Sequence, residues 1–174
     1  ETAAEAAAVL AQLGDEARIL AGGQSLMAVL NMRLARPQRL VDISRSSALA
    51  ELRVDGAMLH VGAAVTQAML EWRPRLAQEL PLLALALPHI SHFQIRNRGT
   101  LGGAVAHGDP AGEFPTVALT LDAQIEATSG KGVRRVPATE FFNGLWETAL
   151  EPGEVLTAVG FPAWGARSGF GFHE

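Results

Sequence analysis

The chain has 174 residues, of which 48% are hydrophobic, and its formal net charge is −4 at pH 7. These values predict one compact domain or two small lobes with a real core, and they exclude a disordered chain. The mild negative charge excludes a basic field for nucleic acid, and the absence of cysteine excludes disulfides and iron–sulfur ligation by this chain.

No membrane span or signal peptide is expected. The longest apolar stretch, "LPLLALALPHI", is interrupted by Pro81 and Pro88 and is shorter than the roughly 20 residues that a span needs. The opening "ETAAEAAAVLAQLG" has no basic flank and is typical of an ordinary helix. The lack of cysteine fits the reducing cytoplasm, where we expect the protein. Without an initiating Met, the sequence is expected to be part of a longer chain.

The first 50 residues predict a small α/β unit. Thr2 and Glu5 match a capping box, and apolar residues then recur at helical spacing until Gly14 closes the helix. Short apolar runs at 18–21 and 39–43 predict strands, and a second helical period lies between them.

A second lobe is expected from about residue 51. The Asp-Gly pair at 55–56 predicts a hairpin, and Thr66 is placed to cap the next helix. Leucine, alanine and proline over 74–88 indicate two or three short helices. A further hairpin with its tip at 129–132 and a strand near 154–162 complete the predicted elements.

Two glycine-rich stretches are the most informative part of the sequence. "ILAGGQSLM" (19–27) lies between a predicted strand and a predicted helix. "IRNRGTLGGAVAHGDPAGEF" (95–114) is interpreted as a second loop, which runs towards a helix that begins close to Gly112 or Glu113. Proline is tolerated only in the first turn of a helix, so Pro115 fixes that start.

Glycines let a backbone turn its N–H groups towards one point and admit a ligand where a Cβ would collide. Two such loops would grip one anionic group, and a diphosphate suits them best, helped by the hydroxyls of Ser25 and Thr100. Glu113 is placed to accept hydrogen bonds from a ribose. The alternative is that both stretches are only tight turns. Neither matches a P-loop or the full Rossmann spacing, which disfavours phosphoryl transfer.

Other polar and aromatic residues have two interpretations each. Arg96 and Arg98 lie at the start of the second stretch, before its glycine pair, and would either neutralise a diphosphate or face solvent and cap carbonyls. Four residues imitate a metal cluster, but structural loop residues are the favoured interpretation: His89, His92, His107 and Asp109. Three tryptophans are interpreted as core or interface residues: Trp72, Trp146 and Trp164.

Three stretches in order resemble the FAD-binding medium subunit of molybdenum hydroxylases, a family that includes the carbon monoxide dehydrogenase and xanthine dehydrogenase flavoproteins. They are "AGGQSLMAVLNMRLARPQRLVDIS", "IRNRGTLGGAVAHGDPAGEFPTVALTLDA" and "FFNGLWETALEPGEVLTAVGFP". The resemblance implies an α+β fold, a two-lobed FAD-binding domain of the vanillyl-alcohol-oxidase (PCMH) type whose C-terminal domain is missing here. It divides 1–174 into a lobe over about 1–50, a lobe over about 51–165 and a tail over 166–174 towards the absent domain.

The resemblance also implies the residues that hold noncovalent FAD. Those of the first loop are Ile19, Leu20, Ala21, Gly22, Gly23, Gln24, Ser25 and Leu26. Those of the second are Thr100, Leu101, Gly102, Gly103, Ala104, His107, Gly112 and Glu113, with Glu113 at the adenosine ribose. Ile90 and Leu156 match apolar positions near the cofactor rings. Ala104 departs from the family's asparagine or serine, and His107 stands where others have threonine.

The function that the resemblance implies is electron transfer. A large molybdopterin-binding subunit oxidises the substrate, [2Fe–2S] clusters of a small subunit relay the electrons, and FAD passes them to an external acceptor such as NAD, quinone or oxygen. No catalytic acid or base, metal ligand or nucleic-acid partner is then expected in this chain. Two alternatives are a stand-alone PCMH-type flavin oxidase and a noncatalytic interaction module.

Overall fold

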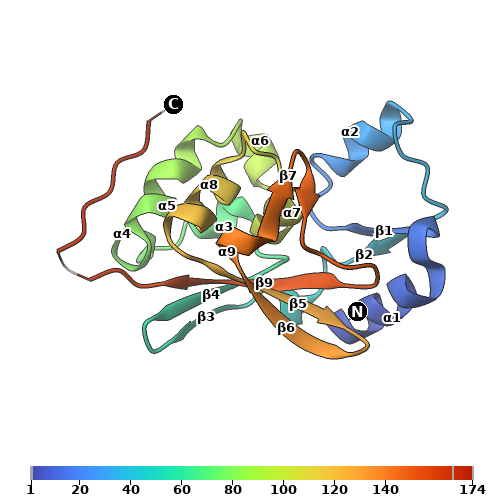
Figure 1. Ribbon diagram of the computed structural model, residues 1–174. Coiled ribbons are helices and arrows are strands. Elements are labelled where there is room, and N and C mark those ends of the chain that lie inside the picture. Colours follow the sequence, from blue (N-terminus) through green and yellow to red (C-terminus); the bar gives the residue numbers. More distant parts are fainter. Residues whose placement is uncertain (1, 166, 174) are drawn as a thin grey trace.

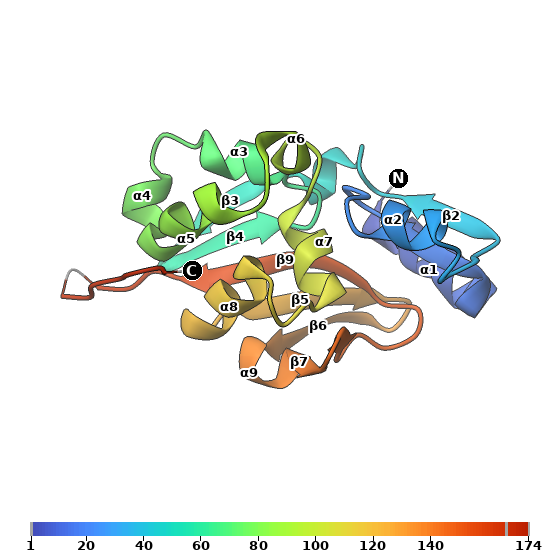
Figure 2. The ribbon, with the colours of Figure 1, turned by 90° about the horizontal axis from the view of Figure 1, so that it is seen from above.

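The computed structural model describes residues 2–165 and 167–173 of the chain. A five-stranded antiparallel sheet carries most of the helices on one face, and a smaller unit built on two parallel strands lies beside it (Figures 1 and 2). Among the described residues, every helix is too short or too polar to cross a membrane.

The smaller unit comes from the start of the chain. Its elements are α1 (Ala3–Leu13), η1 (Gly14–Glu16), β1 (Ala17–Leu20), α2 (Leu26–Asn31) and β2 (Arg39–Asp42). The predicted capping box is confirmed, because Thr2 Oγ1 accepts from the Glu5 amide at 3.2 Å and Glu5 Oε2 accepts from the Thr2 amide at 2.7 Å. Both predicted strands are present, and they pair in parallel.

The large sheet has the strand order β3-β4-β9-β5-β6. Its strands are β3 (Leu52–Asp55), β4 (Met58–Gly62), β5 (Gln124–Ser129), β6 (Gly132–Pro137) and β9 (Val155–Pro162). Both predicted hairpins are confirmed: Asp55 pairs with Met58, which places the first turn one residue later than expected, and Ser129 pairs with Gly132. The predicted last strand forms the centre of the sheet between β4 and β5.

Short helices and a small hairpin fill the segments between these strands. They are η2 (Ser47–Leu49), α3 (Gln67–Glu71), α4 (Leu76–Glu79), α5 (Pro81–Ala86), η3 (Leu87–His89), α6 (Phe93–Arg96), α7 (Leu101–His107), α8 (Glu113–Thr120), α9 (Ala138–Phe141), β7 (Phe142–Gly144) and β8 (Glu147–Thr148). Thr66 caps α3 as predicted, since its hydroxyl accepts from the Met69 amide at 3.1 Å. The short helices over 74–88 are also confirmed.

The interpretation of 95–114 as a glycine-rich loop is wrong for much of its length, because most of it is helical. The side chain of Thr100 caps α7, and Gly108 ends that helix in the left-handed conformation, with φ 63°. Leu101 and Val105 are fully buried, so burial of the apolar face outweighs the low helix propensity of the two glycines between them. The next helix does begin where Pro115 predicts, with Gly112 as its N-cap.

The buried side chains form two clusters. The larger one lies between the sheet and its helices and contains the fully buried rings of Phe114, Phe141 and Phe161. The smaller one joins α1 to β1 and β2 and includes Leu10, Val41 and Val155. Since Val155 belongs to β9, the smaller unit is anchored to the central strand of the large sheet.

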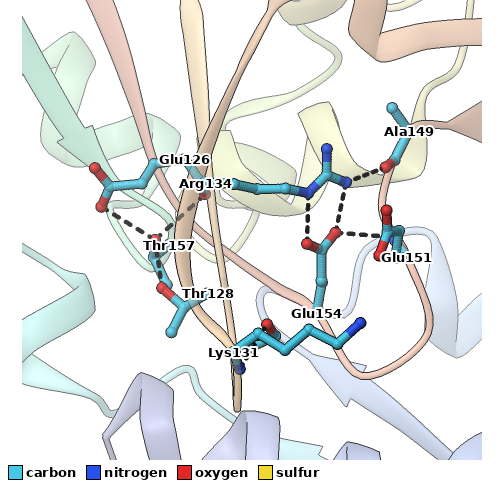
Figure 3. Close-up of polar contacts among 9 residues, drawn as sticks. Glu126, Thr128, Lys131, Arg134, Ala149, Glu151, Glu154 and Thr157 are labelled. Atoms are coloured by element: carbon cyan, nitrogen blue, oxygen red, sulfur yellow. Dashed lines mark hydrogen bonds and ion pairs between the residues drawn. The ribbon is translucent and has the colours of Figure 1, made fainter.

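A charged clamp holds the segment before β9 against β6 (Figure 3). Nε and Nη2 of Arg134 donate to the two Glu154 carboxylate oxygens, at 2.6 and 2.7 Å, and Nη2 also donates to the Ala149 carbonyl. The Glu151 amide donates to the same carboxylate at 2.7 Å. The Arg134 hydrogen bond is the main cause that keeps the pKa of Glu154 below its ordinary value, although burial acts in the opposite direction.

Candidate functional site

The first glycine stretch forms the connection between β1 and α2. Gly23 adopts a left-handed backbone with φ 74°, which favours glycine. The Gln24 side chain donates to the Gly22 carbonyl at 2.9 Å, and the Met27 amide donates to the Gly23 carbonyl at 3.0 Å to begin the helix. Gln24 and Ser25 are exposed, so this loop presents its tip to solvent.

The backbone amides of this loop are available for a ligand. Within the described part of the chain, none of the amides from Gly22 to Leu26 donates a hydrogen bond to another protein group. Backbone N–H groups are obligatory donors, and a run of them in a turn forms a concave site for an anion. The loop therefore has the donor set that an anionic ligand needs.

The amides of the second glycine stretch are mostly occupied. The Leu101 amide donates to the Val65 carbonyl at 3.1 Å, and the Gly103 amide donates to Thr100 Oγ1 at 3.0 Å. The Ala104 amide donates to the Thr100 carbonyl at 3.1 Å. This stretch therefore contributes few amide donors to the site. Its main contribution is to let its backbone lie close to the first stretch.

The two stretches meet, as the sequence predicts. A Cβ on Gly22 would lie 2.2 Å from the Arg98 carbonyl oxygen and 2.7 Å from Gly99 Cα, so only glycine fits at this contact. A Cβ on Gly103 would lie 3.5 Å from the Ala21 side chain. The loop after β1 and the first turn of α7 thus form one continuous surface.

That surface continues along one face of α7. Gly103, Ala104 and His107 are half-buried, whereas Leu101 and Gly102 are buried on the opposite side of the helix. The half-buried Gly112 and Glu113 follow at the start of α8. These half-buried residues are accessible to a ligand, as the predicted cofactor contacts require.

Three of the predicted cofactor residues are not at this surface. The side chains of Ile90, Leu101 and Leu156 are 7%, 0% and 4% exposed and belong to the large hydrophobic cluster. Ile19 and Leu20 are half-buried in β1. The expected contact of Ile90 and Leu156 with the cofactor rings stays a prediction.

The two arginines at the start of the second stretch have different surroundings. Arg96 is committed to the protein: its guanidinium binds both carboxylate oxygens of Glu71, at 2.9 and 3.0 Å, and donates to the Ile90 and Ser91 carbonyls. These bonds confirm the alternative interpretation, in which Arg96 caps carbonyls. Arg98 is exposed, and it is one of the smaller causes that lower the pKa of Asp42, after the hydrogen bonds from Ser44.

The remaining candidates do not form a second site. In the described part of the chain, no three His, Asp or Glu residues lie together as metal ligands. An open hollow of about 550 Å³ is lined by Pro88, Ser91, His92, Phe93, Gln94 and Arg96, and none of the glycines of the two stretches lines it. The core interpretation of the tryptophans is wrong, since Trp72, Trp146 and Trp164 are 80%, 61% and 47% exposed.

Sequence reasoning missed the position of Trp146. It lies at the tip of the β7–β8 hairpin, and its ring faces the His107 ring with centroids 6.4 Å apart and 21° between the planes. The sequence "NGLWET", in which a glycine comes shortly before the aromatic residue, is the signal for a turn at Trp146. It does not reveal which helix this turn contacts.

Comparisons with known proteins identify the family of this chain. Residues 1–164 match the family model described as FAD binding domain in molybdopterin dehydrogenase. The chain is 43% identical, over 95% of its length and 56% of the relative, to the 6-hydroxypseudooxynicotine dehydrogenase complex subunit alpha of Paenarthrobacter nicotinovorans. It is 38% identical to the carbon monoxide dehydrogenase medium chain of Hydrogenophaga pseudoflava, over 98% of its length and 59% of that relative.

The fold agrees as well. A solved structure of carbon monoxide dehydrogenase from Hydrogenophaga pseudoflava, which lacks the Mo-pyranopterin moiety of its cofactor, superposes with a TM-score of 0.92 and 40% identity. That alignment covers 95% of this chain and 57% of the other, so the chain spans little more than half the length of these relatives. The chain belongs to the family of FAD-binding domains in molybdopterin dehydrogenases.

Proposed function

We propose that this chain is the FAD-binding part of the medium subunit of a molybdenum-dependent hydroxylase or dehydrogenase. When bound, FAD supplies the capacity to accept electrons from the [2Fe–2S] clusters of a small partner subunit and to deliver them to an external acceptor. A large molybdopterin-binding subunit is the proposed site of substrate oxidation. The task of this chain is then to bind and orient the cofactor.

One observation carries the proposal: a loop with unused amides meets a helix whose first turn contains the glycines Gly102 and Gly103. The diphosphate of FAD fits this arrangement, because the amides between Gly22 and Leu26, which donate to no other described protein group, would donate to its oxygens. Gly103 presents no side chain beside Ala21, and a Cβ there would lie 2.9 Å from Thr100 Oγ1. The fit needs no covalent attachment, and we assign noncovalent binding.

The other assignments follow the family pattern and rest on it. We assign Gly112 and Glu113 to the adenosine ribose, and Ile90 and Leu156 to the surroundings of the flavin ring. Thr100 would act through its capping of α7, since its hydroxyl already accepts from the Gly103 amide. Arg98 is the exposed cation nearest in sequence to the meeting point of the two stretches.

The finer description of the fold is also a proposal. We assign the chain to the vanillyl-alcohol-oxidase (PCMH) type, with one lobe over about 1–50, a second over about 51–165, and 166–174 leading towards a C-terminal domain. The two hydrophobic clusters support this division, although Val155 links them. The cytoplasmic location expected from the sequence stays a prediction, which fractionation of the source cells would test.

FAD binding by the full-length protein, produced together with its neighbouring subunits, tests the proposal. We expect close to one FAD per chain, yellow colour, and complete release of the flavin on denaturation. A folded protein that takes up no FAD from a molar excess would contradict the proposal. Flavin that stays attached after denaturation would favour the stand-alone oxidase, and a melting temperature raised by a partner protein but not by FAD would favour the interaction module.

A further inference from the structure

Trp146 has an unusual environment for a large aromatic residue. It is 61% exposed, yet its backbone has φ 55°, a left-handed conformation that costs a bulky residue about 1 kcal/mol or more. Its indole faces the His107 ring, with centroids 6.4 Å apart, a separation within the range of aromatic pairs. An exposed aromatic ring in a costly conformation suits the binding of another flat ring.

The hairpin that carries Trp146 is fixed against the end of α7. A Cβ on Gly108 would lie 2.8 Å from Thr148 Cγ2, so the last turn of α7 and strand β8 are in close contact. The Ala149 amide donates to the Phe141 carbonyl at 2.7 Å, and the Ala149 carbonyl accepts from Arg134. The position of Trp146 relative to α7 is therefore set by the fold.

The face of α7 connects Trp146 to the glycine loops. Gly103 and His107 are four residues apart and lie on the same face of the helix, separated by about 6 Å along its axis. That face begins beside Ala21 of the first loop, continues over the small side chain of Ala104, and ends at the two aromatic rings. Both Ala104 and His107 are half-buried, so the face is accessible.

We propose that Trp146 is the stacking platform for the adenine ring of FAD, and that His107 positions the indole. This inference rests on the proposed function. In FAD, one ribose connects the diphosphate to the adenine. If the diphosphate lies at the glycine loops, the ribose would lie along the α7 face that begins at Gly103, and the adenine would lie at Trp146. Every base has a π-face that stacks on an indole, and the contact requires no charge.

The test compares Trp146→Ala and Trp146→Phe with the matched control Leu145→Ala, a 67% exposed neighbour at the same hairpin tip. The variants are made in the full-length protein, and calorimetry gives the affinities for FAD, ADP and FMN. We expect Trp146→Ala to weaken FAD and ADP by about tenfold, the effect of losing one base–aromatic stack. Trp146→Phe should lose less than about threefold, and Leu145→Ala should leave all three affinities unchanged. FMN lacks adenine, so its affinity should be the same in every variant.

His107 has its own test as a positioning residue. His107→Ala should weaken ADP, and His107→Phe should restore its affinity by keeping a flat ring against the indole. Failure of His107→Phe to restore it, in a protein with unchanged melting temperature, would overturn the positioning role.

Each outcome separates the two proposals. Unchanged FAD and ADP affinity in Trp146→Ala overturns the inference and leaves the proposed function standing, and an equal loss of FAD and FMN overturns it too. A wild-type protein that binds no FAD overturns both. If Trp146→Ala fails to fold, quenching of Trp146 fluorescence by ADP, in a background with Trp72→Phe and Trp164→Phe, decides: no quenching overturns the stacking.

Discussion

The two glycine pairs of the site look alike in sequence and differ in physical role. In the first pair, Gly23 has φ 74°, and the amides around it donate to no other group among the described residues. The second pair lies inside α7 with ordinary helical backbone, and the Gly103 amide donates to Thr100 Oγ1. A Cβ on Gly102 would lie 2.4 Å from Ala63 Cα, so this glycine serves the packing of the protein.

The difference teaches that glycine contributes two separate properties. One is conformational freedom, which turns backbone donors towards a ligand. The other is the absence of a side chain, which lets two backbones approach each other closely. The first pair would contribute hydrogen bonds to the cofactor, and the second would bring α7 close enough to complete the surface. Three sets of variants break or sharpen this comparison.

The largest effect is expected from Gly102→Ala. The added Cβ would collide with the backbone of Ala63, which cannot move away as a flexible side chain would, and we expect a loss of about 3 kcal/mol in the free energy of unfolding. In Gly103→Ala, gained helix propensity and a disturbed Thr100 cap nearly cancel, so stability should change by less than about 1 kcal/mol. Urea unfolding of the two variants measures the difference. Equal stabilities would break the distinction between a packing glycine and a ligand-facing one.

A variant far from both pairs separates stability from cofactor affinity. Arg134→Met leaves Glu154 buried without its cation, and we expect a loss of about 2 kcal/mol in unfolding free energy, between the values for exposed and fully buried pairs because Arg134 is 37% exposed. The FAD affinity should not change. A large drop in that affinity would mean that any destabilised variant loses FAD, and the glycine comparison would lose its meaning.

The same clamp gives a pH dependence with a definite sign. The folded-state pKa of Glu154 is lowered from 4.5, so its stabilisation is present above that value and is lost as the pH falls through the lowered folded pKa. Wild-type unfolding free energy should therefore decline on the acid side of about pH 4.5 more steeply than that of Arg134→Met. If unfolding free energy falls with pH equally in the wild type and in Arg134→Met, Arg134 does not lower the pKa of Glu154.

The effect of Gly23→Ala on stability is expected to be smaller than those of Gly102→Ala and Arg134→Met. Left-handed backbone costs alanine about 1 kcal/mol, and the new Cβ would meet flexible side chains of Leu20 and Met27 at 3.2 and 3.3 Å. FAD affinity should fall by about tenfold or more, because the loop amides lose their arrangement. The matched control is Gly56→Ala, which has a similar φ of 57° in open space at a hairpin tip and should leave FAD binding intact. Equal FAD affinity in the two variants would contradict the role of the first loop.

Much of the fold could be predicted because its signals are local. The Thr2 and Thr66 caps, both hairpins and the Pro115 helix start each depend on a few neighbouring residues, and all are present. The helix α7 was missed since two glycines lower its intrinsic propensity, and contacts with distant residues such as Ala63 stabilise it instead. Contacts between residues that are distant in sequence cannot be inferred from local helix propensity.

The candidate site divides in the same way. A glycine pair between a strand and a helix indicated the first loop, and the expectation that both stretches meet is confirmed by Gly22 and Arg98. Sequence could not show that Arg96 is committed to Glu71, which is 25 residues away, nor that Trp146 faces His107. Each of these depends on which side chains the completed fold brings together.

The contact of Gly22 with Arg98 and Gly99 has a thermodynamic consequence. A ligand held by both stretches binds only while this seam is closed, so binding and closure are linked, and each must favour the other to the same extent. At a ligand concentration 100 times Kd the linkage reaches about 2.7 kcal/mol. Amide hydrogen exchange at the seam should therefore slow on saturation, while exchange in the distant β5–β6 turn stays as it was.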